Sequence, residues 1–199
     1  MADEDEKTTL HRYLRSARQD LLAKLDGLSE YDVRRPLTPT GTNLLGLVKH
    51  LAFTESGYLG ETFGRPLGEP LAEDEDNPNA DLYATAEESR EQITGHYREV
   101  WAHSDATIDA LALDAEGRVP WWPGEHGRVT LHQILVHTIA ETNRHGGHAD
   151  IVRELIDGAV GLHATGQNLP ERDQAWWENY RAQLEQIAQQ AARSSADRQ

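Results

Sequence analysis

The sequence contains no cysteine among its 199 residues. No disulfide framework can therefore form, and any metal ion must be held by nitrogen and oxygen ligands such as histidine, aspartate and glutamate. A reaction that requires a thiol needs that thiol as a separate small molecule. The absence of cysteine thus limits both how the chain can be stabilised and which chemistry it can perform alone.

Long hydrophobic runs and an excess of basic residues are also missing. The longest apolar stretches are as short as residues 44–53, well below the roughly 20 residues that cross a bilayer. The N-terminal MADEDEKTT is acidic and lacks the basic start of a secretion signal, which predicts a cytoplasmic protein without membrane contact. With 19 basic against 34 acidic residues, the net charge of -15 disfavours nucleic acid as a partner. A small-molecule substrate is the expected partner.

Apolar residues recur at steps of three and four through most of the chain, which indicates amphipathic helices. Helices are expected over residues 5–25, 43–63, 85–111, 130–157 and 170–193, the third opening with a capping box of Thr85 and Glu88. Proline, glycine and an acidic run predict a long solvated crossover over residues 64–80.

No alternating strand pattern accompanies these helices, so the predicted fold class is all-α. It is a four-helix bundle with a long crossover between the second and third helices and an additional C-terminal helix. A chain of this length fits a single core. We expect the bundle over residues 1–161, with residues 162–199 as a helical extension packed on the same domain.

Histidines concentrate in the fourth predicted helix. Five of the ten fall within 23 residues, and Glu141 and His145 are spaced i and i+4, on the helix face that Ile134 and Val152 also share. Polar groups on an apolar face cost several kcal/mol unless they are paired or bind a metal. The spacing would equally allow His137 to pair with Glu141, so the partner helix must decide between these two pairs.

His50 is the candidate third ligand, because it lies within the apolar run of the second helix. Two histidines and one glutamate with an open fourth position are typical of a catalytic zinc site, and the same set can hold iron or nickel. The alternative is that His50 is a hydrogen-bonded core histidine and that Glu141 and His145 form a buried pair without a metal.

Two segments resemble a known family. HTIAETNRHGGHADIVRELIDGAVG at residues 137–161 resembles the fourth-helix signature of the DinB-like superfamily, and LVKHLAFTESGYL at residues 47–59 resembles its second-helix motif. Many members place three histidines at the metal, the last two as HxxxH, whereas this chain has Glu141 at the first of those two positions. In this it is similar to the mycothiol-dependent maleylpyruvate isomerases, in which a His, a Glu and a His hold zinc. The resemblance therefore implies a metal site of His50, Glu141 and His145.

Relatives of this kind are four-helix bundles, often dimeric, and those of established activity are largely metal-dependent transferases or isomerases that use a small thiol. The resemblance implies a homodimer whose divalent metal, zinc before nickel or iron, activates a mycothiol-like thiol. His148 and Arg144 are the candidate catalytic residues, with Tyr58 as a further residue that orients the substrate. The Trp121-Trp122 loop is a candidate wall of the site, although packing is the favoured role for these tryptophans.

Two other functions fit the same residues. In a metal-dependent hydrolase the ion would activate water, with Glu55 or His148 as the base and no thiol. In a non-catalytic metal-binding stress protein, the ion would tie the second helix to the fourth. Activity that requires no added thiol would indicate the hydrolase.

Overall fold

The computed structural model describes residues 5–68, 77–161 and 169–196. Within these residues the regular secondary structure is helical apart from one two-stranded sheet, which confirms the all-α fold class. The chain divides into two compact units, Met1–Gly166 and Gln167–Gln199. No helix in the described part is long and apolar enough to cross a membrane.

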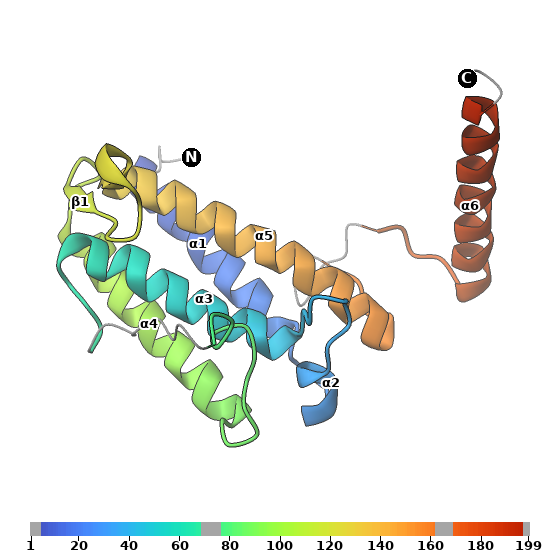
Figure 1. Cartoon of the computed structure of the whole chain (residues 1–199), viewed down its shortest axis with the longest axis horizontal. Helices are drawn as coiled ribbons and strands as arrows, with labels where there is room; N and C mark the ends of the chain where they lie inside the picture. The colour runs from blue at the N-terminus through green and yellow to red at the C-terminus, as the bar shows by residue number, and fades with distance from the viewer. Residues whose placement is uncertain (1–4, 69–76, 162–168, 197–199) are drawn as a thin grey trace. The chain divides into compact units, whose positions relative to one another are not determined.

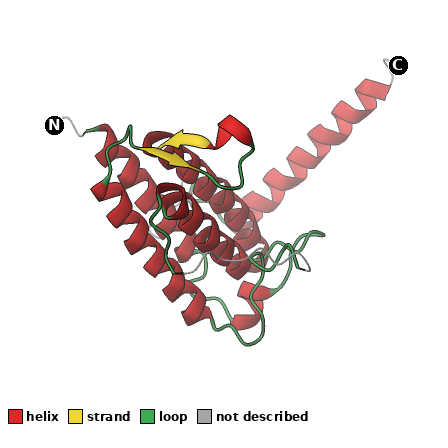
Figure 2. Ribbon diagram, turned by 60° about the vertical axis from the view of Figure 1, so that its left-hand side comes forward, coloured by secondary structure: helices red, strands yellow, loops and turns green. Residues whose placement is uncertain are grey.

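Four long helices of the first unit lie side by side (Figures 1 and 2). They are α1 (Glu6–Ala23), α3 (Leu44–Leu59), α4 (Arg90–Ala110) and α5 (Leu131–Asp157). Helix α1 packs against α5 and α4, and α3 packs against α4 and α5. The seam between α3 and α5 therefore brings together the two segments that carry the predicted metal ligands.

Local sequence signals define the helix ends. The N-cap side chains of Asp5, Asn43 and Thr130 each accept a hydrogen bond from a backbone amide three residues later. Gly158 closes α5 in the left-handed conformation at φ 75°, which glycine adopts without steric cost.

The third long helix begins later than the sequence predicts. Its capping box is formed by Ser89 and Gln92, so the prediction of Thr85 and Glu88 is wrong. The Glu88 carboxylate does accept a hydrogen bond from the Thr85 amide at 2.7 Å, but it also pairs with Lys49 at 2.8 Å. Glu88 therefore ties this segment to α3 and does not start the helix.

Several short elements lack a period long enough to be recognised in the sequence. They are α2 (Glu30–Arg34), the 3-10 turns Glu61–Phe63 and Gly124–Gly127, and an antiparallel pair of strands, β1 (Glu116–Arg118) and β2 (Arg128–Thr130). The connection between the strands carries the two tryptophans, Trp121 and Trp122. Of the predicted crossover, residues 69–76 lie outside the described residues, and the parts on either side contain no helix.

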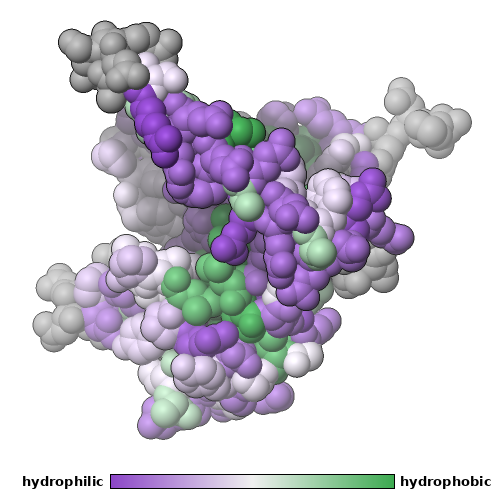
Figure 3. Space-filling view, turned by 90° about the vertical axis from the view of Figure 1, so that its right-hand side faces the viewer, coloured by the Kyte–Doolittle hydropathy of each residue, from purple (hydrophilic) through white to green (hydrophobic). Residues whose placement is uncertain are grey.

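The core consists of two apolar clusters at different levels of the bundle. One includes Leu21, Leu51 and Tyr97, and the other includes Leu14 and Ile134. Polar residues separate the two levels, because Arg18 follows Leu14 and precedes Leu21 on the buried side of α1. Hydrophilic residues predominate on the face drawn in Figure 3, with hydrophobic residues gathered in patches.

The second unit contains α6 (Gln174–Ala196). Its large apolar side chains recur at steps of four and three and are exposed: Trp176, Tyr180, Leu184 and Ile187. Packing of this C-terminal extension on the bundle stays a prediction.

Candidate metal centre

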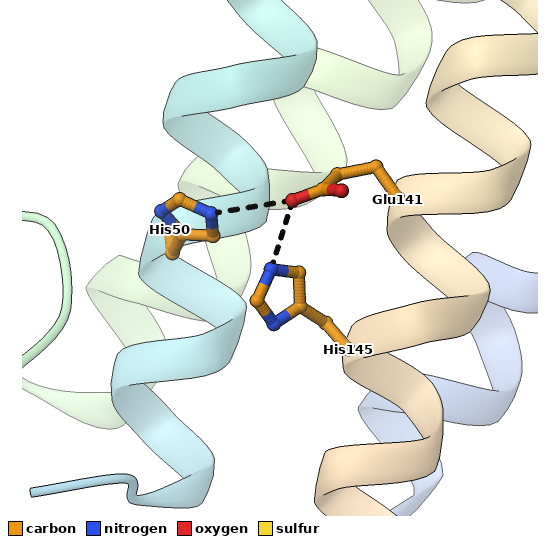
Figure 4. A group of neighbouring side chains, drawn as sticks. All are labelled: His50, Glu141 and His145. Carbon is orange, nitrogen blue, oxygen red and sulfur yellow. Dashed lines mark hydrogen bonds and ion pairs between the residues drawn. The ribbon is translucent and has the colours of Figure 1, made fainter. Parts of the chain in front are cut away.

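His50, Glu141 and His145 converge in the seam between α3 and α5 (Figure 4). Their potential ligand atoms all lie within 4.8 Å of one another. Glu141 Oε1 lies 3.0 Å from His145 Nε2 and 3.9 Å from His50 Nε2. Ligands about 2.1 Å from a tetrahedral ion are separated by about 3.4 Å, so these spacings bracket the geometry that zinc requires.

Asp81 fixes the orientation of His50 and was missed in the sequence. Its Oδ2 lies 2.6 Å from His50 Nδ1, on the side of the ring opposite the nitrogen that faces Glu141. Histidines that bind a metal usually donate their second ring N–H to a carboxylate in this way. No sequence signal singled out Asp81, because several acidic residues nearby are equally suitable by spacing.

His148 occupies the corresponding position beside His145. The Nδ1 atoms of the two rings are 3.3 Å apart, while His145 Nε2 faces Glu141. If His145 carries its proton on Nδ1 and donates it to His148, its Nε2 lone pair is free for a metal. Burial, and next the proximity of His50, lower the pKa of His145 despite the opposing effect of Glu141, which favours the neutral form that a metal requires.

The three side chains fit a divalent ion. One carboxylate oxygen lies between two imidazole nitrogens, and each imidazole has a partner at its other nitrogen that can hold the proton there. The side chains of His50, Glu141 and His145 are 18%, 30% and 13% exposed, so the cluster is partly accessible to solvent.

A family model described as mycothiol-S-transferase matches residues 9–158. This match covers the four long helices apart from the first turn of α1, and it includes all three candidate ligands. The chain belongs to the mycothiol-S-transferase family. We found no curated protein with a significant match. The family agrees with the mycothiol-related branch that the sequence motifs indicate, and the wider DinB-like placement stays a prediction.

The structure distinguishes between the two pairs that the spacing allowed in this mycothiol-S-transferase family member. His145 lies beside Glu141, whereas the ring of His137 contacts Tyr58 and Trp122, with centroid separations of 4.6 and 5.2 Å. His137 therefore belongs to an aromatic cluster one turn away from the metal centre.

The proposed catalytic residues lie at different distances from the cluster. His148 contacts His145, as described above, and Arg144 is exposed on α5 beside it in sequence. Glu55, the alternative base of a hydrolase, is in the wrong place for that role. It is 1% exposed and pairs with Arg18 at 2.6 Å, because five residues of helix turn it about 140° away from His50.

Proposed function

We propose that this protein is a metal-dependent thiol S-transferase that uses mycothiol or a similar small thiol. The observation that carries the proposal is the His50, Glu141 and His145 cluster, placed in a chain of the mycothiol-S-transferase family. A divalent metal held there, zinc before nickel or iron, would supply the Lewis acidity that lowers the pKa of a thiol placed at its open position.

The chain's own residues have separate tasks in this proposal. Glu141 supplies the negative ligand, and His50 and His145 supply neutral nitrogens. Asp81 accepts a hydrogen bond from His50 Nδ1 and so keeps the proton on that nitrogen. His148 Nδ1 accepts a hydrogen bond from His145 Nδ1 in the same way. Because His148 is exposed, it can pass a proton to water when the thiol is deprotonated. Arg144 remains the candidate for orienting an anionic part of a substrate.

Elemental analysis of purified protein tests the metal centre. We expect about one divalent ion per chain in the wild type and loss of that ion in His50→Ala and in Glu141→Ala. His132→Ala is the matched control, because His132 lies on the same helix but pairs with Glu6 at 3.2 Å, outside the cluster. A wild type that neither contains nor binds zinc would refute metal dependence and leave a hydrogen-bonded polar cluster.

A thiol-transfer assay tests the activity itself. Mycothiol and a bimane halide should be consumed together by the zinc-loaded wild type, and much more slowly by Glu141→Ala. Hydrolysis of an ester at the same rate with and without thiol would instead favour the hydrolase. Of the two candidate bases for that reaction, only His148 lies near the cluster.

The homodimer is a further prediction. Ile151 and Leu155 near the end of α5 are each 62% exposed, although sequence spacing assigns Leu155 to the apolar face of the helix. Analytical ultracentrifugation of the wild type beside Ile151→Glu would test whether this surface joins two copies.

A further inference from the structure

Four rings gather beside the metal centre at the end nearer the strands. Tyr58 of α3 contacts Trp121 at 5.3 Å, Trp122 at 5.8 Å and His137 of α5 at 4.6 Å between ring centroids, all edge to face. We call these four residues the aromatic cluster. Its members come from two helices and from the connection between β1 and β2.

The aromatic cluster lies along the same seam as the metal ligands. His137 precedes Glu141 by four residues on α5, which is about 6 Å along the helix axis. Gly57 follows His50 by seven residues on α3, about 10 Å along the axis and on nearly the same face. A small organic molecule is long enough to reach from one group to the other.

Gly57 keeps the Trp121 indole against this face of α3. A Cβ at position 57 would lie 2.6 Å from Trp121 Cη2, so any larger residue would push the indole away. Trp122 packs on the apolar core, whereas Trp121 remains 44% exposed although it touches both Gly57 and Tyr58. Core packing therefore accounts for the position of Trp122, whereas much of the Trp121 ring remains accessible to a ligand.

We propose that the aromatic cluster binds the electrophilic substrate and selects molecules with a planar aromatic body. This inference rests on the proposed function, in which the thiol occupies the metal centre. When the electrophile is an organic halide, the thiol sulfur forms a bond to the electrophilic carbon while the bond between that carbon and the halogen breaks. The halide leaves with the bonding electron pair, and the thiol proton passes to water. The aromatic cluster holds the body of the electrophile so that its reactive carbon lies next to the sulfur.

Binding of unreactive probes tests the subsite separately from catalysis. The probes are 2-naphthylacetamide and its fully saturated decahydro analogue, titrated calorimetrically into the full-length, zinc-loaded protein. We expect the wild type to bind the naphthyl probe about tenfold more tightly, because each aromatic pair adds stabilisation beyond simple burial. The preference should fall to about twofold or less in Trp121→Leu and in Tyr58→Leu.

Two further variants sharpen this test. Gly57→Ala favours helix formation, so it should fold, yet it must displace the indole and lower the preference. Trp176→Leu removes a tryptophan of similar exposure from α6 and should leave the preference unchanged. Circular dichroism melting would verify that each variant is folded.

Each outcome decides a separate question. Equal binding of the two probes by the wild type, or a preference that survives both Trp121→Leu and Tyr58→Leu, overturns the aromatic subsite. Selective binding without any thiol transfer leaves the subsite in place and refutes the proposed function. Thiol transfer without selective binding supports the proposed function and refutes the aromatic subsite.

Discussion

The bundle holds two polar clusters that touch different faces of α3, and they differ in whether their charges are balanced. The first is the candidate metal centre of His50, Glu141 and His145. The second cluster, which we call the ion cluster, consists of Arg18, Glu55, Asp105, Arg15 and His11. The three side chains of the first are 18%, 30% and 13% exposed, whereas Arg18 and Glu55 of the second are each 1% exposed and form an ion pair.

Two arginines neutralise the two carboxylates of the ion cluster, because Arg15 also pairs with Asp105 at 3.0 Å. Arg18 binds Glu55 through two nitrogens, at 2.6 and 3.0 Å, and a third nitrogen contacts Asp105 at 2.7 Å. Burial lowers the pKa of Arg18, but the two carboxylates outweigh it and keep the pKa above its usual value. Burial raises the pKa of Glu55 against the opposing charge of Arg18. The cost of burying these charges is thus offset within the protein.

The candidate metal centre has no arginine or lysine partner of this kind among the described residues. Its ligands are one carboxylate and two imidazoles, and its partners Asp81 and His148 add a second carboxylate and another imidazole. No arginine or lysine side chain of the described residues pairs with these groups by an ion pair within 4.0 Å. The carboxylates of the ion cluster are thus neutralised by the chain itself, whereas the proposed function requires a bound cation beside Glu141.

The largest expected effect comes from breaking the ion cluster. Arg18→Met leaves Glu55 buried without a positively charged partner and should lower the free energy of unfolding by about 3–5 kcal/mol. The double variant Arg18→Met with Glu55→Leu should recover most of that loss, because no buried charge remains from the pair. Urea denaturation measures both. A single variant as stable as the wild type would show that the ion cluster contributes little.

Zinc should distinguish the two clusters. At a free zinc concentration of about 100 times the Kd, the wild type should gain about 2.7 kcal/mol of stability. Arg18→Met should gain a similar amount on its lower baseline, whereas Glu141→Gln should gain little. Thermal melts with and without zinc provide the measurement, and equal gains in all three proteins would contradict a site at Glu141.

Asp81→Ala should weaken zinc binding by about 10- to 100-fold, because His50 loses the carboxylate that fixes its proton and its orientation. Competition with a chelator measures the Kd. Asp114→Ala is the matched control, since it removes an exposed carboxylate with the same change in net charge. If both variants bind zinc equally well, the contact with Asp81 has no role in metal binding.

The sequence predicted the long helices because their apolar period extends over many turns. It also placed His50, Glu141 and His145 on candidate faces, and the structure brings these three side chains together. Short elements such as α2 and the strand pair were not predicted, because three to five residues are too few to show a repeat of apolar positions.

Long-range pairing was the other limit of sequence reasoning. His11 has no histidine or carboxylate three or four residues away on its helix, yet its Nε2 lies 2.7 Å from Asp105, which is distant in sequence. The same is true of Asp81 beside His50. Spacing identifies partners on one helix, whereas partners on different elements depend on how the helices pack.

Asp105→Asn should change stability less than the other variants. The pH dependence of its stability separates the contribution of the Asp105 charge from that of side-chain packing. Burial raises the pKa of Asp105, but hydrogen bonds from Arg18 and then His11 outweigh it and hold the pKa below its ordinary value. Because the folded pKa is depressed, the ionised carboxylate stabilises the fold fully above about pH 4, and this contribution is lost as the pH falls through the folded pKa. The variant should therefore be about 1–2 kcal/mol less stable than the wild type at pH 7.

The difference between the two proteins should narrow below about pH 4 in urea denaturation series. Zinc binding at pH 7 should be unchanged in Asp105→Asn, because Asp105 belongs to the ion cluster and not to the metal centre. A difference that stays constant from pH 7 to pH 3 would mean that Asp105 acts through packing alone. A weakened zinc affinity would mean that the two clusters are energetically coupled. The comparison of two independent clusters, one with its charges paired and one without, would then be wrong.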